Sequence, residues 1–292
     1  MVFWSYFLAL GANLAFSSAS LVYAKYSALR SPMWMNATKA SIAFAALSIL
    51  IVFFPPKTLE WAAIGNFALS GFVGLNIGDL FLLRAFVQLG PGRTLMLFGF
   101  HPLILGSLSW LLFDESIASY KMISVVFFVA CLFLFSLESY QKDRTWNLKG
   151  LSYAVIGVLL DASGILLTRN AFELAPEYSN VHGHFFRTMG AVAGFIVFAW
   201  IKPFNFIEGF KSLQPKGKFW VVLASLAGTF LSLLMYLGAI KYGELATVSA
   251  IAITGPLFAT FLEHVVHKKR PSIYLWWSLV FFVSGFTLLL LI

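Results

Sequence analysis

The chain has 292 residues, of which 60% are hydrophobic and only 11% are charged. This composition excludes an ordinary soluble domain and is typical of a membrane protein. The formal net charge of +8 arises from 20 Lys and Arg residues against 12 Asp and Glu residues. Because most basic residues fall in short links between apolar stretches, we interpret the charge as a membrane-topology signal and not as a nucleic-acid interface.

Ten apolar stretches are long enough to cross a bilayer, which takes about 20 helical residues. They lie near residues 4–24, 33–53, 61–83, 93–113, 119–138, 149–170, 180–200, 218–240, 245–265 and 273–292. We expect the first stretch to be retained as a helix, because residues 1–7 lack the Lys or Arg of a secretory signal. The single cysteine, Cys131, excludes an intramolecular disulfide and a cysteine metal cluster. The sequence predicts an all-α integral membrane protein with ten transmembrane helices.

The chain repeats a segment of itself at a constant offset of 154 residues, as in the pair Gly74 and Gly228. The repeat predicts two five-helix copies, residues 1–140 and 149–292, joined by a linker at 141–148. An odd number of spans in each copy places the second copy upside down relative to the first. Many secondary transporters are built from such inverted repeats, with polar residues near the middle of the membrane.

The basic residues are distributed unequally over the two sets of links. The links after odd-numbered spans hold 14 Lys and Arg residues, whereas the opposite links and the termini hold 4. The remaining two, Lys39 and Arg187, lie inside predicted helices. Since positively charged links tend to stay in the cytoplasm, the count predicts that both termini lie outside it.

Short motifs recur at the ends of the third and fourth predicted helices and of their repeats. The first copy contains Gly71-Phe72-Val73-Gly74, Gly78-Asp79, Arg84-Ala85-Phe86-Val87-Gln88-Leu89-Gly90, His101-Pro102 and Phe113-Asp114-Glu115. The second copy contains Gly238-Ala239-Ile240-Lys241-Tyr242-Gly243-Glu244 and Gly255-Pro256, but His267-Lys268-Lys269-Arg270 replaces the acidic turn. With two five-helix copies, these motifs resemble the EamA-like members of the drug/metabolite transporter superfamily.

The resemblance implies alternating access around a central cavity built from the first four helices of each copy. The fifth and tenth helices would serve packing or dimer contacts, so the chain is expected to be a monomer or a homodimer. We expect a multi-pass protein of the cell (inner) membrane that carries a small polar organic metabolite, with amino-acid export as the leading option. Family members usually place both termini in the cytoplasm, which is opposite to the Lys/Arg count.

Four charged residues lie well inside predicted helices, where each needs a partner or a water-filled cavity. They are Lys39, Asp79, Asp161 and Arg187. Lys39 and Arg187 occupy matching places in the two copies, so they could clamp a carboxylate or a phosphate, or each could pair with an acidic neighbour. Asp79 and Asp161 are candidates for proton coupling, since a carboxyl group in a low-dielectric cavity can load and release a proton. A salt bridge that never titrates is the alternative for Asp79.

Six further residues complete the candidate substrate-binding set: His101, Asn13, Asn36, Asn76, His184 and Tyr236. The histidines lack the spacing of a metal site, so no metal or other cofactor is expected. Catalytic clusters, a repeated pore-lining ring and a nucleotide-binding loop are also lacking, which argues against an enzyme, a channel and an ATP-driven pump. One alternative is a transporter of anionic or phosphorylated metabolites held by Lys39 and Arg187. An alternative of another class is a non-transporting membrane receptor or scaffold.

Overall fold

The computed structural model describes residues 2–101, 104, 121–143, 147–201, 203–242, 254–267 and 272–291, and every element described there is helical. Six helical stretches are long and apolar enough to cross a membrane: Trp4–Leu29, Pro32–Phe53, Trp61–Leu89, Leu148–Leu174, Asn180–Ile201 and Pro215–Tyr242. They coincide with the first, second, third, sixth, seventh and eighth predicted spans. The all-α membrane architecture is therefore confirmed for the described residues.

The other four predicted spans contain further helices. They are α5 (Pro91–Met96) with the short η2 (Leu97–Phe100), α7 (Lys121–Asp143), α14 (Thr254–His267) and α15 (Ile273–Leu291). Residues 105–120 and 243–253, over which the predicted fourth and ninth spans continue, lie outside the described residues.

Helices of the first copy have counterparts in the second. The first copy holds α1 (Val2–Leu29), α2 (Pro32–Phe53), α3 (Trp61–Ser70), η1 (Gly71–Gly78) and α4 (Asp79–Leu89). Their counterparts are α8 (Leu148–Leu174), α9 (Asn180–Ile201), α11 (Pro215–Ser225), η3 (Leu226–Leu231) and α12 (Ser232–Tyr242). The link that follows α9 is longer than the link that follows α2, and it contains the short α10 (Phe206–Lys211).

The third helix of each copy contains a π-helical segment at the same position of the repeat. The 154-residue offset places residues 226–231 of η3 on residues 72–77, which lie inside η1. A π-helical turn holds one residue more than an α-helical turn, and such turns occur frequently at functional sites. The polar residues in and around these two segments are therefore the first place to look for a site.

Glycines allow α9 to approach the helix formed by α3 and η1. A Cβ atom on Gly71 would lie 1.7 Å from the carbonyl oxygen of Arg187, and one on Gly190 would lie 2.0 Å from that of Ala68. Neither distance could be accommodated without moving backbone, so small residues set this crossing. The crossing brings the turn of α9 that carries Arg187 against η1.

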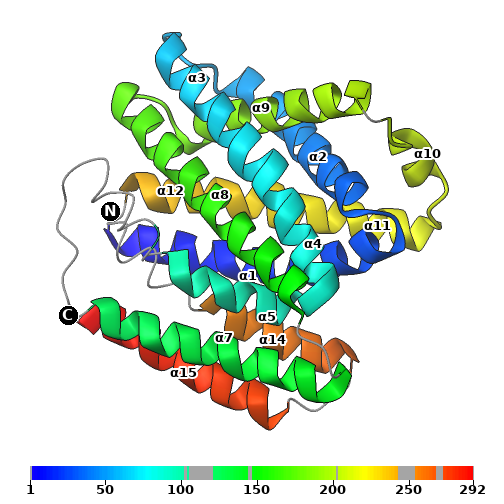
Figure 1. Cartoon of the computed structure of the whole chain (residues 1–292). Coiled ribbons are helices and arrows are strands. Elements are labelled where there is room, and N and C mark those ends of the chain that lie inside the picture. The colour runs from blue at the N-terminus through cyan, green and yellow to red at the C-terminus, as the bar shows by residue number, and fades with distance from the viewer. Residues whose placement is uncertain are drawn as a thin grey trace.

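Two helices lie at the edge of the molecule and pack on the rest of it through one face, where Cys131, Leu279 and Phe282 join a cluster with residues of α4 and α8. Figure 1 shows α7 and α15 side by side along one edge, and they pack against each other over their lengths. Many large apolar side chains are exposed on the outer surface, including Trp4, Trp61 and Trp200 near helix ends, as expected for side chains at a membrane interface.

Candidate functional site

A cavity of about 110 Å³ lies between the two copies. Its described lining comes from α1, α2, η1, α4, α5 and His101 in the first copy, and from α8, α9, η3, α12 and α14 in the second. No described residue of α7 or α15 is part of this lining. The cavity brings together seven of the ten predicted site residues: Asn13, Lys39, Asp79, His101, Asp161, Arg187 and Tyr236.

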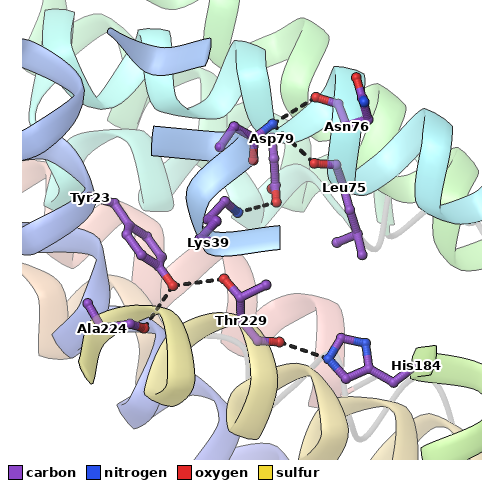
Figure 2. Close-up of polar contacts among 9 residues, drawn as sticks. Tyr23, Lys39, Leu75, Asn76, Asp79, His184, Ala224 and Thr229 are labelled. Carbon is purple, nitrogen blue, oxygen red and sulfur yellow. Dashed lines mark hydrogen bonds and ion pairs between the residues drawn. The ribbon is translucent and has the colours of Figure 1, made fainter. Parts of the chain in front are cut away.

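Lys39 and Asp79 form a buried ion pair at the cavity. The Lys39 ammonium donates to Asp79 Oδ2 and thereby joins α2 to α4 (Figure 2). Lys39 Nζ also lies 5.3 Å from the centroid of the Tyr23 ring, which adds a cation–π contact. Because an ion pair is neutral as a unit, Lys39 offers no net positive charge to a ligand while the pair is intact.

The buried Tyr23 hydroxyl joins this region to the second copy. It donates to the carbonyl oxygen of Ala224 at 2.8 Å and lies 2.8 Å from Thr229 Oγ1 (Figure 2). Since the tyrosine proton goes to the carbonyl group, the Thr229 hydroxyl must donate to Tyr23. The sequence analysis missed both residues. The available signal was a tyrosine inside an apolar helix, because a buried tyrosine hydroxyl usually has a hydrogen-bond partner.

Arg187 carries a buried positive charge into the cavity. Only 1% of the residue is exposed, and its Nε and Nη1 have no hydrogen-bond partner among the described residues. Arg187 also forms no ion pair with any of the described residues. An unpaired buried guanidinium is energetically costly. An anionic ligand in the cavity would reduce this cost by pairing with Arg187.

His101 and Asp161 meet across the cavity. His101 Nε2 lies 3.4 Å from Asp161 Oδ2, which is an ion pair whenever the imidazole is protonated. His101 follows η2 of the first copy, whereas Asp161 lies on α8 of the second. The Asp161 side chain is 27% exposed, so its carboxylate remains accessible from the cavity.

Neutral polar groups complete the lining. Asn13 on α1 and Tyr236 on α12 both face the cavity. Ser17 lies one turn from Asn13 and donates to the carbonyl oxygen of Gly255 at 2.8 Å, which ties α1 to α14. Among the described residues, no group of three His, Cys, Asp or Glu side chains could hold a metal ion.

The three remaining predicted residues, Asn36, Asn76 and His184, are buried but do not line the cavity. Asn36 Nδ2 donates to the carbonyl oxygens of Leu75 at 3.1 Å and Asn76 at 2.8 Å. Asn76 Nδ2 in turn donates to a carbonyl oxygen of α9, that of Ala191, at 2.8 Å. The Asn36 side chain therefore holds backbone groups of the π-helical segment, and the Asn76 side chain ties that segment to α9.

The EamA-like transporter family model matches residues 3–137 and 148–291, one match on each copy. The chain belongs to the EamA-like transporter family. This membership confirms the resemblance to the drug/metabolite transporter superfamily. As an EamA-like protein, the chain is a multi-pass membrane protein of a transporter family, whose partners are the lipid bilayer and a small-molecule substrate.

One solved crystal structure resembles this EamA-like chain with a TM-score of 0.69. The match covers 99% of this chain and 96% of the other, with 14% of residues identical. At this identity, the likeness supports a shared fold alone. No curated protein matches the chain in sequence.

Proposed function

We propose that the chain is a secondary transporter that moves a small polar organic metabolite across the cell (inner) membrane by alternating access. In this proposal, ten transmembrane helices form two inverted five-helix repeats, residues 1–140 and 149–292, with a linker at 141–148. The composition of the cavity lining supports it, because the described lining residues come from the first four helices of each copy. Rocking of one copy against the other would expose such a cavity to each side of the membrane in turn.

We infer the substrate class from two side chains of opposite charge that border the same part of the cavity. A Cβ atom on Gly74 would lie 3.5 Å from Arg187 Nη2 and 3.9 Å from Asp161 Oδ1. The two side chains therefore border the same space, yet they form no ion pair with each other among the described contacts. A zwitterion such as an amino acid complements this arrangement, with its carboxylate near Arg187 and its ammonium group near Asp161.

Protons are the proposed coupling ion, with Asp161 and His101 as the residues proposed to carry them. The two residues belong to different copies, so rocking of the copies changes their separation. A proton taken up by the pair on one side of the membrane can then be released on the other. Net export of the substrate remains a prediction that follows from the family resemblance.

Counterflow in liposomes tests this function. Vesicles that contain the purified protein and an unlabelled amino acid inside should accumulate the same labelled amino acid from outside. Arg187→Gln should lower this exchange by at least about tenfold. The substrate carboxylate would lose its buried cationic partner, and truncating one partner of a buried charge pair costs about 2–5 kcal/mol. Arg169→Gln is a matched control, because Arg169 is exposed and pairs with Glu173 at 3.2 Å. If the vesicles exchange no amino acid, organic acid or organic cation, the chain is not a transporter of this class. That result would support a receptor or scaffold role.

A transporter of anionic or phosphorylated metabolites is the second candidate. The buried charge of Arg187 favours it, but the twin clamp of Lys39 and Arg187 is weakened, because Lys39 already binds Asp79. Exchange of phosphorylated compounds and failure of amino acids in the same assay would support this candidate over the first.

The Lys/Arg count supports an orientation with both termini outside the cytoplasm. Cysteine labelling tests it, starting from a Cys131→Ser background. Cysteines introduced at Lys57 and Lys211 lie in links on opposite sides in the ten-helix proposal. A membrane-impermeant reagent applied to intact cells should label position 57 and not position 211. The reverse pattern would place both termini in the cytoplasm.

A further inference from the structure

Helices α2 and α9 occupy equivalent places in the two copies, and their first turns fix the register between them. Each helix has 22 residues. Ser31 Oγ accepts the backbone N–H of Trp34 at 3.1 Å, and Ser179 Oγ accepts that of His182 at 3.4 Å. Both serines occupy the N-cap position, where a hydroxyl group satisfies a free backbone N–H. An offset of 148 residues therefore relates α2 to α9.

The same register relates the contacts that these helices make with the π-helical segments. Asn36 Nδ2 donates to the carbonyl oxygen of Leu75, and His184 Nε2 lies 2.9 Å from that of Thr229 (Figure 2). Asn36 and His184 are 148 residues apart, and Leu75 and Thr229 are 154 residues apart. The first offset relates α2 to α9 and the second relates η1 to η3, so the two copies build the same local arrangement from different side chains.

The cations follow this symmetry, but the counterion does not. Lys39 and Arg187 are 148 residues apart, so each lies at the same place on its helix. Lys39 is paired with Asp79, whose counterpart 154 residues later is Leu233. Leu233 lines the cavity and packs against a cluster that includes Ala191, one turn after Arg187. The second copy has therefore kept the buried cation and has an apolar side chain where the carboxylate would be.

Other acidic groups at the cavity do not replace the missing carboxylate. Asp79 is bound to Lys39, and Asp161 lies beside His101. Among the described residues, neither forms an ion pair with Arg187. The guanidinium keeps free N–H groups at Nε and Nη1 in that part of the chain. The remaining nitrogen, Nη2, borders the same space as Asp161 Oδ1. It forms a donor fork with either Nε or Nη1, and such a fork matches a carboxylate in shape as well as in charge.

We propose that Arg187 is the anion subsite of the cavity. A carboxylate group of the substrate binds there beside Leu233, at the position equivalent to that of the Asp79 carboxylate beside Lys39. The inference rests on the proposed function, since it requires the cavity to hold the substrate. A monoanionic carboxylate is favoured over a phosphate dianion, because the Asp161 carboxylate borders the same space and repels a second negative charge.

Leu233→Asp tests the subsite by supplying the carboxylate from the protein itself. Leu233→Asn is the matched control, with nearly the same shape and no charge. Binding of the common amino acids is measured by calorimetry and by ligand-induced thermal shift on purified protein. The aspartate variant should bind at least about tenfold more weakly than the asparagine variant, because an internal carboxylate competes for Arg187. Equal affinity of the two variants would overturn the proposal.

A comparison on the unaltered protein keeps the test independent of whether these variants fold. An amino acid that binds is compared with its carboxamide, in which a neutral amide replaces the carboxylate and the amine is retained. The carboxamide should bind at least about tenfold more weakly. Equal binding of the two compounds would overturn the carboxylate subsite. Stronger binding of a phosphate ester than of the amino acid would also overturn it.

The outcomes separate this inference from the function on which it rests. If the unaltered protein exchanges amino acids but the Asp and Asn variants bind alike, the transporter function stands and the placement at Leu233 fails. If the unaltered protein neither binds nor exchanges any compound in the panel, both proposals fail.

Discussion

The imidazole of His101 lies 3.4 Å from the carboxylate of Asp161, and the contact joins the first copy to the second. In the proposed rocking motion, a contact between the copies can break and re-form, whereas contacts within one copy persist. His101 and Asp161 are therefore placed where a change in protonation would alter the balance between two conformations of the whole molecule.

Asp161→Asn should lower exchange of amino acids by at least about tenfold and remove its dependence on pH, because the amide neither titrates nor carries a charge. Glu173→Gln is the matched control, since Glu173 lies on the same helix but is exposed and pairs with Arg169. Counterflow measured at several pH values in liposomes gives both results. Normal transport by a folded Asp161→Asn variant, with the pH profile of the unaltered protein, would remove Asp161 from the coupling proposal.

Breaking the Lys39–Asp79 pair should destabilise the protein strongly. Each of Lys39→Met and Asp79→Leu leaves one buried charge without its partner, which costs about 3–5 kcal/mol. The double variant should be much more stable than the sum of the two losses predicts, because it leaves no unpaired charge. Unfolding by SDS in mixed micelles measures all three variants. Additive losses would mean that the two residues act independently.

Two glycines of the same helix provide a matched test of the crossing between α3–η1 and α9. A Cβ atom on Gly71 would lie 1.7 Å from the Arg187 carbonyl oxygen, whereas one on Gly65 would meet no atom within 4 Å. Gly71→Ala should cost about 1–3 kcal/mol or more through overpacking. Gly65→Ala should stabilise by about 0.5–1 kcal/mol through helix propensity. Thermal unfolding in detergent measures both, and equal effects would contradict the crossing described here.

The link between α8 and α9 should respond to acid through Glu177. Glu177 Oε1 accepts from Thr58 Oγ1 at 2.9 Å. A hydrogen bond from its own backbone N–H, followed by the Thr58 hydroxyl, lowers the pKa of Glu177 below its usual value of 4.5. Because the pKa is lower in the folded state, the carboxylate stabilises the protein near neutral pH, and this contribution is lost as the pH falls through the folded value.

Thermal unfolding of the unaltered protein and of Glu177→Gln, compared over a range of pH, measures this contribution. The unaltered protein should be slightly more stable near neutral pH, and the difference should vanish in acid. The effect should be small, because the side chain is fully exposed and solvent screens its interactions. A difference that grows as the pH falls would contradict the assignment.

The sequence was sufficient for the parts of the fold that follow from apolar length and from the repeat. Runs of about 20 apolar residues predict spans directly, and charged residues inside them must face a cavity or a partner. Lys39, Asp79, Asp161 and Arg187 all line the cavity for this reason.

The sequence could not predict which charges pair, because pairing depends on the rotation of each helix about its axis. The Lys39–Asp79 pair and the unpaired guanidinium of Arg187 emerge only when α2, α4 and α9 are packed together. Asn36 and His184 were predicted as site residues for their polarity, yet they hold carbonyl groups of the π-helical segments behind the lining. A π-helical turn has no clear signal in a single sequence, so this role could not be foreseen.

The two π-helical segments also bear on the history of the chain. Residues 226–231 fall within the first segment when the repeat offset is applied. The simplest origin of two equivalent distortions is one distortion in an ancestral half-length chain, which was inherited by both halves when the gene duplicated. The difference between Asp79 and Leu233 must then have arisen after duplication. An ancestral dimer of identical halves would have been electrically symmetric, and the loss or gain of one carboxylate left the modern cavity with a paired cation, Lys39, in one half and an Arg187 without an ion pair among the described residues in the other.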